Sequence, residues 1–215
     1  MQHALPTEDQ PTQADASALA GSTGMLTLFS DVGLLVALLA ACLATAGSLF
    51  FSEVWGWIPC VLCWYQRILM YPLVAVLAVG ILRRDPAVYA YVLPISLAGM
   101  AMSLYHYLLI KTDLFPPPAC QAGIPCDVDY LNLFGFINIP FLALLAFAII
   151  SVGVALQSAA PAPDPDADGR GILFDHGLLR AGAVAVIVLG VAGAFLLLAQ
   201  AEMQRVQAFA GWGVL

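Results

Sequence analysis

Five long stretches of the sequence are apolar and contain almost no charged residues. A helix needs about 20 such residues to cross the hydrocarbon core of a bilayer. The stretches meet or approach this length, and they lie at or within residues 32–51, 68–82, 86–110, 131–156 and 181–201. Because a backbone in lipid must satisfy its hydrogen bonds within the segment, each stretch is predicted to be a helix. The chain is therefore predicted to be an all-α membrane protein.

The rest of the chain supplies too little polar surface for a soluble fold. Of its 215 residues, 62% are hydrophobic and 10% are charged, whereas a soluble domain is about 45–50% apolar and about 25% charged. The formal net charge is −7, so the chain lacks the basic surface with which proteins bind nucleic acid. Composition therefore excludes a soluble enzyme and a nucleic-acid-binding protein, and it makes the lipid bilayer the surroundings of the fold.

The same pattern divides the chain into four segments. Residues 1–30 contain no Lys or Arg, so they lack the positive start of a secretory signal and are interpreted as a disordered polar tail. Residues 31–157 contain the first four membrane helices. Residues 158–178 are rich in Pro and Asp, which is typical of a flexible linker. Residues 179–215 contain the fifth helix and a C-terminal tail.

The few basic residues indicate how the chain crosses the membrane, because cytoplasmic loops carry more Lys and Arg than outer loops do. Arg83 and Arg84 lie between the second and third helices, and Arg170 and Arg180 lie between the fourth and fifth. Placing both loops in the cytoplasm puts the N-terminus inside and the C-terminus outside. Two close pairs of cysteines then lie on the outer side.

Cys60 and Cys63 form a C-V-L-C motif at the predicted start of the second helix. Pro59 suits the first helical position because it has no N–H group to leave unpaired, and Cys60 would then lie in the first turn. The free N–H groups and the dipole of a helix start favour a thiolate. Arg67 lies one turn beyond Cys63 on the same face. An ionisable residue in an apolar span is expected to be functional, and this guanidinium could stabilise a thiolate or polarise an oxygen of a ligand.

Cys120 and Cys126 form the second pair, in the loop between the third and fourth helices. Gly123 and Pro125 supply the turn that lets the two sulfurs meet. Closing so small a ring stabilises the fold by only about 2 kcal/mol. Three prolines at 116–118 should hold this loop away from the membrane. The prediction is an accessible disulfide of the exchangeable kind.

Spacing alone leaves other interpretations of these residues open. Both pairs could be structural disulfides, since the outer compartment is oxidising. The four cysteines could also bind a metal, but a C-x-x-C motif at a helix start lacks the turn of metal knuckles, and no metal is predicted. His106, near the outer end of the third helix, is either satisfied at the interface or a hydrogen-bond donor to a ligand. Cys42, in the first helix, is interpreted as a small hydrophobic residue.

The run from Ile58 to Arg67, I-P-C-V-L-C-W-Y-Q-R, resembles the signature of the DsbB family of disulfide bond formation proteins, and within it the branch called BdbC. The resemblance covers roughly residues 32–157, with the second cysteine pair and a G-x-x-x-x-P element at 135–140. The related vitamin K epoxide reductase family also uses a quinone, but its loop cysteines precede the C-x-x-C motif. Here the C-x-x-C motif comes first, which favours the DsbB family.

The resemblance implies a four-helix bundle that holds a quinone, either ubiquinone or menaquinone, near the outer surface of the bacterial cytoplasmic membrane. It also implies a partner, a thioredoxin-fold dithiol carrier similar to DsbA. Cys120 would form the mixed disulfide with this carrier, Cys126 would be its partner, and electrons would pass to the Cys60–Cys63 disulfide. Cys63 would face the quinone, and Arg67 would support the quinone and the thiolate.

His106 lies in a region where members of that family carry a histidine, which makes it a candidate to donate a hydrogen bond to a quinone carbonyl. Three features depart from the best-known pattern of the family. The position before Arg67 is Gln66 rather than an acid, as in part of the family. The loop between Cys120 and Cys126 is much shorter than in enterobacterial members, and the fifth helix has no counterpart in a four-helix bundle. Two hypotheses compete with the oxidase: a membrane scaffold or sensor with two structural disulfides, and a reductase that runs the relay in reverse, as the vitamin K enzyme does. The potentials of quinone and carrier decide the direction.

Overall fold

The computed structural model describes residues 13–112, 125–159 and 177–211, and these residues form five α-helices. The helices and the short π-helical turn that continues the first of them are α1 (Gln13–Leu49), η1 (Phe50–Val54), α2 (Val61–Arg83), α3 (Val88–Lys111), α4 (Ile139–Ala159) and α5 (Gly177–Gly211). Five helical segments are long and apolar enough to cross a membrane. The prediction of an all-α membrane protein is confirmed.

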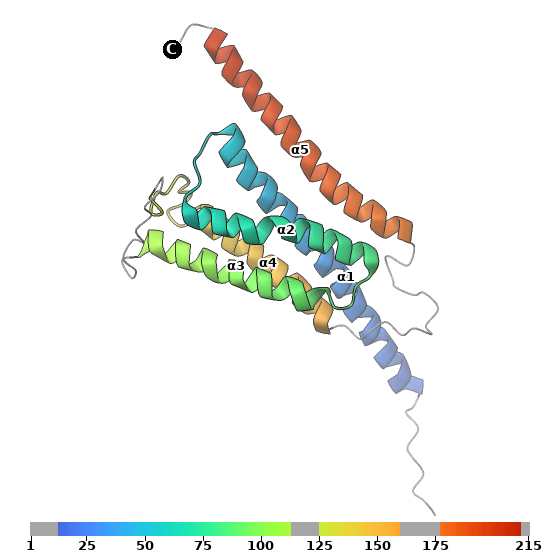
Figure 1. Cartoon of the computed structure of the whole chain (residues 1–215). Coiled ribbons are helices and arrows are strands. Elements are labelled where there is room, and N and C mark those ends of the chain that lie inside the picture. Colours follow the sequence, from blue (N-terminus) through green and yellow to red (C-terminus); the bar gives the residue numbers. More distant parts are fainter. Residues whose placement is uncertain (1–12, 113–124, 160–176, 212–215) are drawn as a thin grey trace, which may run out of the picture.

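Helices α1 to α4 form a bundle in which each helix packs against two neighbours (Figure 1). The order around the bundle is α1, α2, α3, α4, and the contact between α4 and α1 closes it. Small residues bring these two helices together, because a Cβ atom added at Gly33 of α1 would lie 2.9 Å from the carbonyl oxygen of Gly153 in α4. Such close backbone approach is typical of helix pairs in membranes.

The core lies along the axis of this bundle. Phe147 of α4 is fully buried there, and its ring occupies the space that a Cβ atom at Gly99 of α3 would need. One polar contact crosses the core, since the hydroxyl of Ser151 donates to that of Ser96 at 2.9 Å. Each of these contacts joins α3 to α4, so the third and fourth helices are fixed against each other.

Helix α5 lies outside the bundle, against α1, α2 and η1 (Figure 1). Most of its apolar side chains are exposed, including Val186 at 72% and Leu189 at 70%. In a membrane such side chains face lipid, so they need no protein partner. The sequence prediction of a fifth helix beside a four-helix bundle is therefore confirmed.

Two predicted boundaries are wrong. Helix α1 begins at Gln13, so residues 13–30 are helical and only residues 1–12 of the expected tail lie outside the described part of the chain. This segment is rich in Ala and has no Pro after Pro11, and extending a helix that already exists costs little. Helix α5 likewise continues to Gly211 instead of ending near residue 201. Most of the linker, residues 160–176, lies outside the described residues.

One end of the bundle collects the segments that carry chemistry. The end of α1, the start of α2, the end of α3 and the loop before α4 all meet there (Figure 1). Rings of Phe51, Trp55, Trp57 and Tyr130 pack against one another at this end, with centroid distances between 4.9 and 5.4 Å. Arg83 and Arg84 lie at the opposite end, where α2 finishes.

Candidate functional site

Cys60 is the N-cap of α2, not a residue of its first turn. Its backbone is extended, with φ −71° and ψ 172°, and its sulfur accepts a hydrogen bond from the backbone N–H of Cys63 at 3.3 Å. The sulfur thus takes the place of the oxygen that usually caps a helix. The predicted position of Pro59 as the first helical residue is wrong for the same reason, because Pro59 precedes the cap. The two sulfurs of the C-x-x-C motif lie 3.0 Å apart, and both residues are free thiols.

The surroundings of Cys60 favour its thiolate. The thiol of Cys63 donates a hydrogen bond to the Cys60 sulfur, and the His106 ring and the Cys63 backbone N–H add further stabilisation. Together they lower the pKa of Cys60 to about 4, against the opposing effect of burial. A hydrogen bond to the charged form is one of the physical causes that lower a pKa. Reduced Cys60 is therefore a thiolate at neutral pH.

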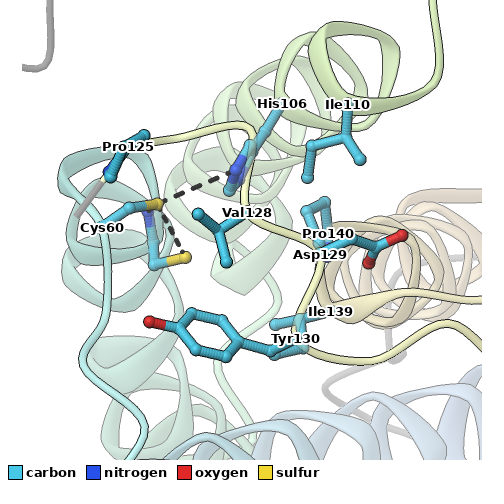
Figure 2. Close-up of a pocket in the computed structure, with 10 residues that line it drawn as sticks. Cys60, His106, Ile110, Pro125, Val128, Asp129, Tyr130, Ile139 and Pro140 are labelled. Atoms are coloured by element: carbon cyan, nitrogen blue, oxygen red, sulfur yellow. Dashed lines mark hydrogen bonds between the residues drawn. The ribbon is translucent and has the colours of Figure 1, made fainter.

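His106 of α3 lies beside Cys60 and is buried, with 2% of its surface exposed. Its Nε2 atom is 3.8 Å from the sulfur of Cys60 and 3.0 Å from the carbonyl oxygen of Cys126. Its Nδ1 atom is 3.2 Å from the side-chain nitrogen of Gln66, a buried residue of α2. The ring therefore joins α2, α3 and the loop that follows α3 (Figure 2).

Cys126 is buried as well, with 4% of its surface exposed, and it packs in one cluster with Cys60, Leu62 and Leu109. It is in a disulfide bond, and its predicted partner, Cys120, lies outside the described residues. The expectation of an accessible disulfide is wrong at Cys126. The reason is that the loop folds back over the start of α2 and encloses the sulfur.

Two contacts hold this loop in place. Lys111, the last residue of α3, forms an ion pair with Asp129 at 2.9 Å, and both side chains are about 20% exposed. The ring of Tyr130 stacks on that of Trp57, with centroids 5.4 Å apart and planes 16° apart. Asp129 and Tyr130 also line a small cavity with Cys60, Cys63 and His106 (Figure 2). The loop thus closes one side of the cysteine site.

A larger cavity of about 420 Å³ lies on the other side of Cys63. It is bounded by α1, α2, α4, η1 and the loops before α2 and α4, and its wall is mostly apolar. Its polar groups come mainly from Ser48 of α1 and from Gln66, Arg67 and Tyr71 of α2. Both its size and its few polar groups are typical of a site for a small organic ligand.

Arg67 brings a positive charge to the wall of this cavity. Its Nη2 atom donates to the carbonyl oxygen of Ser48 at 3.0 Å, and its guanidinium lies 5.3 Å from the ring centre of Trp64. Within the described part of the chain, no carboxylate forms an ion pair with Arg67. The remaining donors can therefore bind an oxygen of a ligand. A flat apolar ring with polar oxygens at its edge fits this donor and these walls.

The structure thus distributes the predicted residues over two cavities. Cys60, Cys63 and His106 line the small cavity, whereas Cys63 and Arg67 line the large one. His106, a predicted ligand contact, does not line the large cavity. Sequence analysis missed Gln66, although a buried amide in a membrane span carries the same signal that identified Arg67.

The donor atoms of Cys60, Cys63 and His106 lie within 4.8 Å of one another, which is close enough to consider a metal. However, the two sulfurs are 3.0 Å apart, nearer than the ~3.8 Å that tetrahedral bonds of about 2.3 Å to zinc would give. The distance is thus too short for a zinc site and longer than the bond of about 2.05 Å in a disulfide. The expectation that the chain uses no metal stays a prediction.

Comparison with known proteins gives the same family that the motif resembles. Residues 30–157 match the family model described as disulfide bond formation protein DsbB. Disulfide bond formation protein C of Bacillus subtilis is 50% identical over 117 residues, which are 54% of this chain and 85% of the relative. A probable disulfide formation protein of Oceanobacillus iheyensis is 49% identical over 129 residues, which are 59% of this chain and 89% of the relative. No solved structure matches the chain. The matched segment contains both cysteine pairs and ends before α5.

Proposed function

Because the chain belongs to the DsbB family of disulfide bond formation proteins, we propose that it reoxidises a dithiol carrier similar to DsbA and transfers the electrons to a membrane quinone. Family membership and the helices support the coarser statement directly: the chain is a multi-pass membrane protein of thiol–disulfide oxidation. The observation that supports the rest is that Cys63 lines both cavities. A sulfur in that position can connect disulfide exchange on one side with a bound acceptor on the other.

The first half of the proposed reaction is exchange between sulfurs. A thiolate of the carrier attacks Cys120, and the disulfide to Cys126 breaks with its electron pair on Cys126. The second carrier thiolate then attacks the carrier sulfur bonded to Cys120, which leaves the carrier oxidised and both loop cysteines reduced. Cys126 packs against Cys60, so it is placed to pass this reduction to the Cys60–Cys63 disulfide. Each step exchanges one S–S bond for another and needs no further oxidant.

The second half concerns the large cavity. Arg67, Ser48 and Tyr71 would hold a quinone there among apolar walls, and a bound quinone supplies an acceptor for two electrons and two protons. Cys63 faces this cavity as well as its partner Cys60. The guanidinium of Arg67 would polarise a ligand oxygen and stabilise a thiolate at Cys63. The size of the cavity accommodates the ring of either ubiquinone or menaquinone.

We place the protein in the bacterial cytoplasmic membrane, with its cysteines on the outer side and its N-terminus in the cytoplasm. Two features of the structure support this orientation. Arg83 and Arg84 lie at the end of the bundle remote from the cysteines, as expected for a cytoplasmic end. The stacked aromatic rings of η1, the following loop and Tyr130 lie at the cysteine end, and such rings collect at membrane interfaces.

The test is quinone reduction by purified full-length protein supplied with a reduced carrier, followed by the absorbance of the quinone. Cys63→Ser should reduce the rate to background, and Cys42→Ser should leave it unchanged because Cys42 belongs to the bundle core. Full activity in Cys63→Ser would overturn the proposal. Alkylation of the cysteines with and without quinone separates the alternatives, because a scaffold would show no change and a reductase would oxidise its cysteines while reducing the carrier.

A further inference from the structure

Two buried polar side chains, those of Gln66 and His106, form a chain of contacts that the proposed electron route does not use. Gln66 contacts Nδ1 of His106 at 3.2 Å, and Nε2 of the same ring contacts the carbonyl oxygen of Cys126 at 3.0 Å and the sulfur of Cys60 at 3.8 Å. Gln66 is 5% exposed and His106 is 2% exposed. Polar groups in such surroundings cost free energy unless their hydrogen bonds are satisfied. The contacts of Gln66 and His106 therefore determine which groups the His106 ring can hold by a hydrogen bond.

The contacts fix where the ring carries its proton. The side-chain nitrogen of Gln66 is a donor, so Nδ1 of His106 must accept. In a neutral imidazole the proton then lies on Nε2, and this N–H faces the two groups that Nε2 contacts. One is an oxygen that can only accept, and the other is the sulfur of Cys60. The second nitrogen of a histidine commonly sets the tautomer in this way.

We propose that His106 is the positioning residue for exchange between the two cysteine pairs: Gln66 fixes its tautomer, and its Nε2–H group holds the backbone of Cys126 against Cys60. This role rests on the proposed function and adds to it a residue that acts through two sulfurs. It differs from a contact with the quinone, because His106 lies on the small cavity and Arg67 on the large one.

The role follows from the sulfur chemistry. The thiolate of Cys126 attacks the Cys60 sulfur, so the bond to Cys63 breaks and its electron pair leaves on Cys63. Cys120 then attacks Cys126, and Cys60 leaves as a thiolate. His106 acts in both steps, first by fixing the distance between the attacked and attacking residues and then by donating to the Cys60 thiolate. Two electrons move from the loop pair to the C-x-x-C pair, and no other reactant is needed.

Few other ionisable groups of the described residues lie near Cys60. Cys63 comes from α2, and Asp129 and Tyr130 come from the loop and line the same cavity. The carboxylate of Asp129 is paired with Lys111 of α3. Arg67 donates to α1 instead. A change at His106 therefore removes one polar neighbour of Cys60 and leaves the others in place.

The experiment uses full-length protein with Cys42, Cys63 and Cys120 replaced by Ser, so that only Cys60 and Cys126 remain. Their disulfide is equilibrated with glutathione buffers, which gives the effective concentration of one thiol at the other. His106→Leu should lower this value by up to about tenfold, as expected for loss of the neutral hydrogen bond that holds the carbonyl oxygen of Cys126. Loss of the hydrogen bond to the Cys60 thiolate acts in the opposite direction, and the pKa of Cys60, measured separately below, corrects for it. His106→Gln, whose amide N–H can replace Nε2–H, should restore most of the effective concentration. The effective concentration in Gln66→Leu should lie between the values for His106→Leu and His106→Gln. This substitution no longer fixes the tautomer of His106, but it keeps the imidazole ring.

A second measurement separates positioning from mere packing. In reduced protein with Cys42, Cys120 and Cys126 replaced by Ser, the pH midpoint of Cys60 alkylation is mapped by mass spectrometry. His106→Leu should move this midpoint upward from about 4, the pKa of Cys60, and His106→Gln should move it less. Equal effective concentrations in the parent and His106→Leu would overturn the inference. So would equal losses in His106→Leu and His106→Gln, because both would then reflect packing alone.

The two proposals can fail separately. If the full-length protein with all five cysteines does not reduce quinone with a reduced carrier, the proposed function falls, and the glutathione equilibrium still decides the role of His106. If quinone reduction is normal but the equilibrium is insensitive to His106, the function stands and the inference is wrong.

Discussion

The two cavities that meet at Cys63 differ in size, in polarity and in the way their walls are held. The small one is enclosed by the start of α2, by α3 and by the loop after Cys126, and hydrogen bonds and an ion pair fix its groups. The large one, of about 420 Å³, is bounded by apolar side chains of three helices and contains the guanidinium of Arg67. Only the small cavity has walls that are fixed closely enough to hold two sulfurs in one geometry.

The difference matches two kinds of chemistry. Exchange between disulfides needs an attacking sulfur in line with the bond that it breaks, and it is faster when the leaving thiolate has a low pKa. A ligand that enters, reacts and leaves needs space and mostly apolar contact, with few polar anchors. Cys63 lines both cavities, whereas Cys60 lines only the small one and Arg67 only the large one. A substitution at Cys60 or Arg67 therefore changes one cavity and leaves the other intact. The predictions below are ordered by the size of that disturbance.

Cys60→Ser should disable the small cavity alone and give the largest loss. It removes the sulfur that Cys126 would attack, so carrier-driven quinone reduction should fall by about 1,000-fold or more. The large cavity keeps Cys63 and Arg67, so equilibrium binding of quinone should change little. The paired measurements are the rate by quinone absorbance and the bound quinone by extraction. Loss of bound quinone together with activity would show that the two cavities are not separable.

Arg67→Ala should disturb the large cavity alone. Losing a charged donor to a ligand oxygen corresponds to roughly 10- to 100-fold in quinone affinity, which should appear as a higher KM for quinone. Arg67→Lys should recover part of this loss, since it keeps the charge but not the planar fork. Alkylation of Cys60 should be unchanged in both variants. A changed Cys60 alkylation rate would mean that Arg67 acts on the small cavity instead.

Filling the large cavity should have a smaller effect. Gly47 of α1 lines this cavity, and a Cβ atom there meets nothing within 4 Å. Gly47→Leu should therefore fold normally and raise the KM for quinone by about tenfold, the lower end of the range for an extra aliphatic group in a pocket. Gly190→Leu is the matched control, because Gly190 is equally open but lies exposed on α5. Equal effects of the two substitutions would contradict a ligand site in this cavity.

The contrast between the cavities could be predicted from sequence only in part. Helical spacing alone places Arg67 on the face of Cys63, and an unbroken apolar span predicts the helix that carries both. The small cavity depends on contacts between residues far apart in the chain, such as Gln66 with His106 and Lys111 with Asp129. No local pattern encodes the fold-back of the loop that buries Cys126, because tertiary packing decides it.

The errors in the predicted starts of α1 and α2 also arise because local sequence does not decide the structure there. Pro59 and Cys60 suit the first turn of a helix by local rules, yet Cys60 is the cap because its sulfur accepts from Cys63. The expected tail before residue 31 contains little that breaks a helix, so α1 extends back to Gln13. Local propensity decides such ends weakly, and a hydrogen bond or an existing helix shifts them.

The smallest expected effect is the response of reduced Cys60 to pH, and it tests the small cavity directly. The pKa of this thiol is lowered to about 4, so the thiolate fraction is nearly complete above pH 6 and falls only as the pH approaches 4. The rate of alkylation at Cys60 should therefore be almost flat between pH 6 and 8. After unfolding in detergent, the same thiol should return to an ordinary pKa of about 8.5, and its rate should rise nearly tenfold per pH unit. A tenfold rise per unit in the folded protein would show that the hydrogen bonds at Cys60 do not stabilise its thiolate, and the contrast with the large cavity would then rest on shape alone.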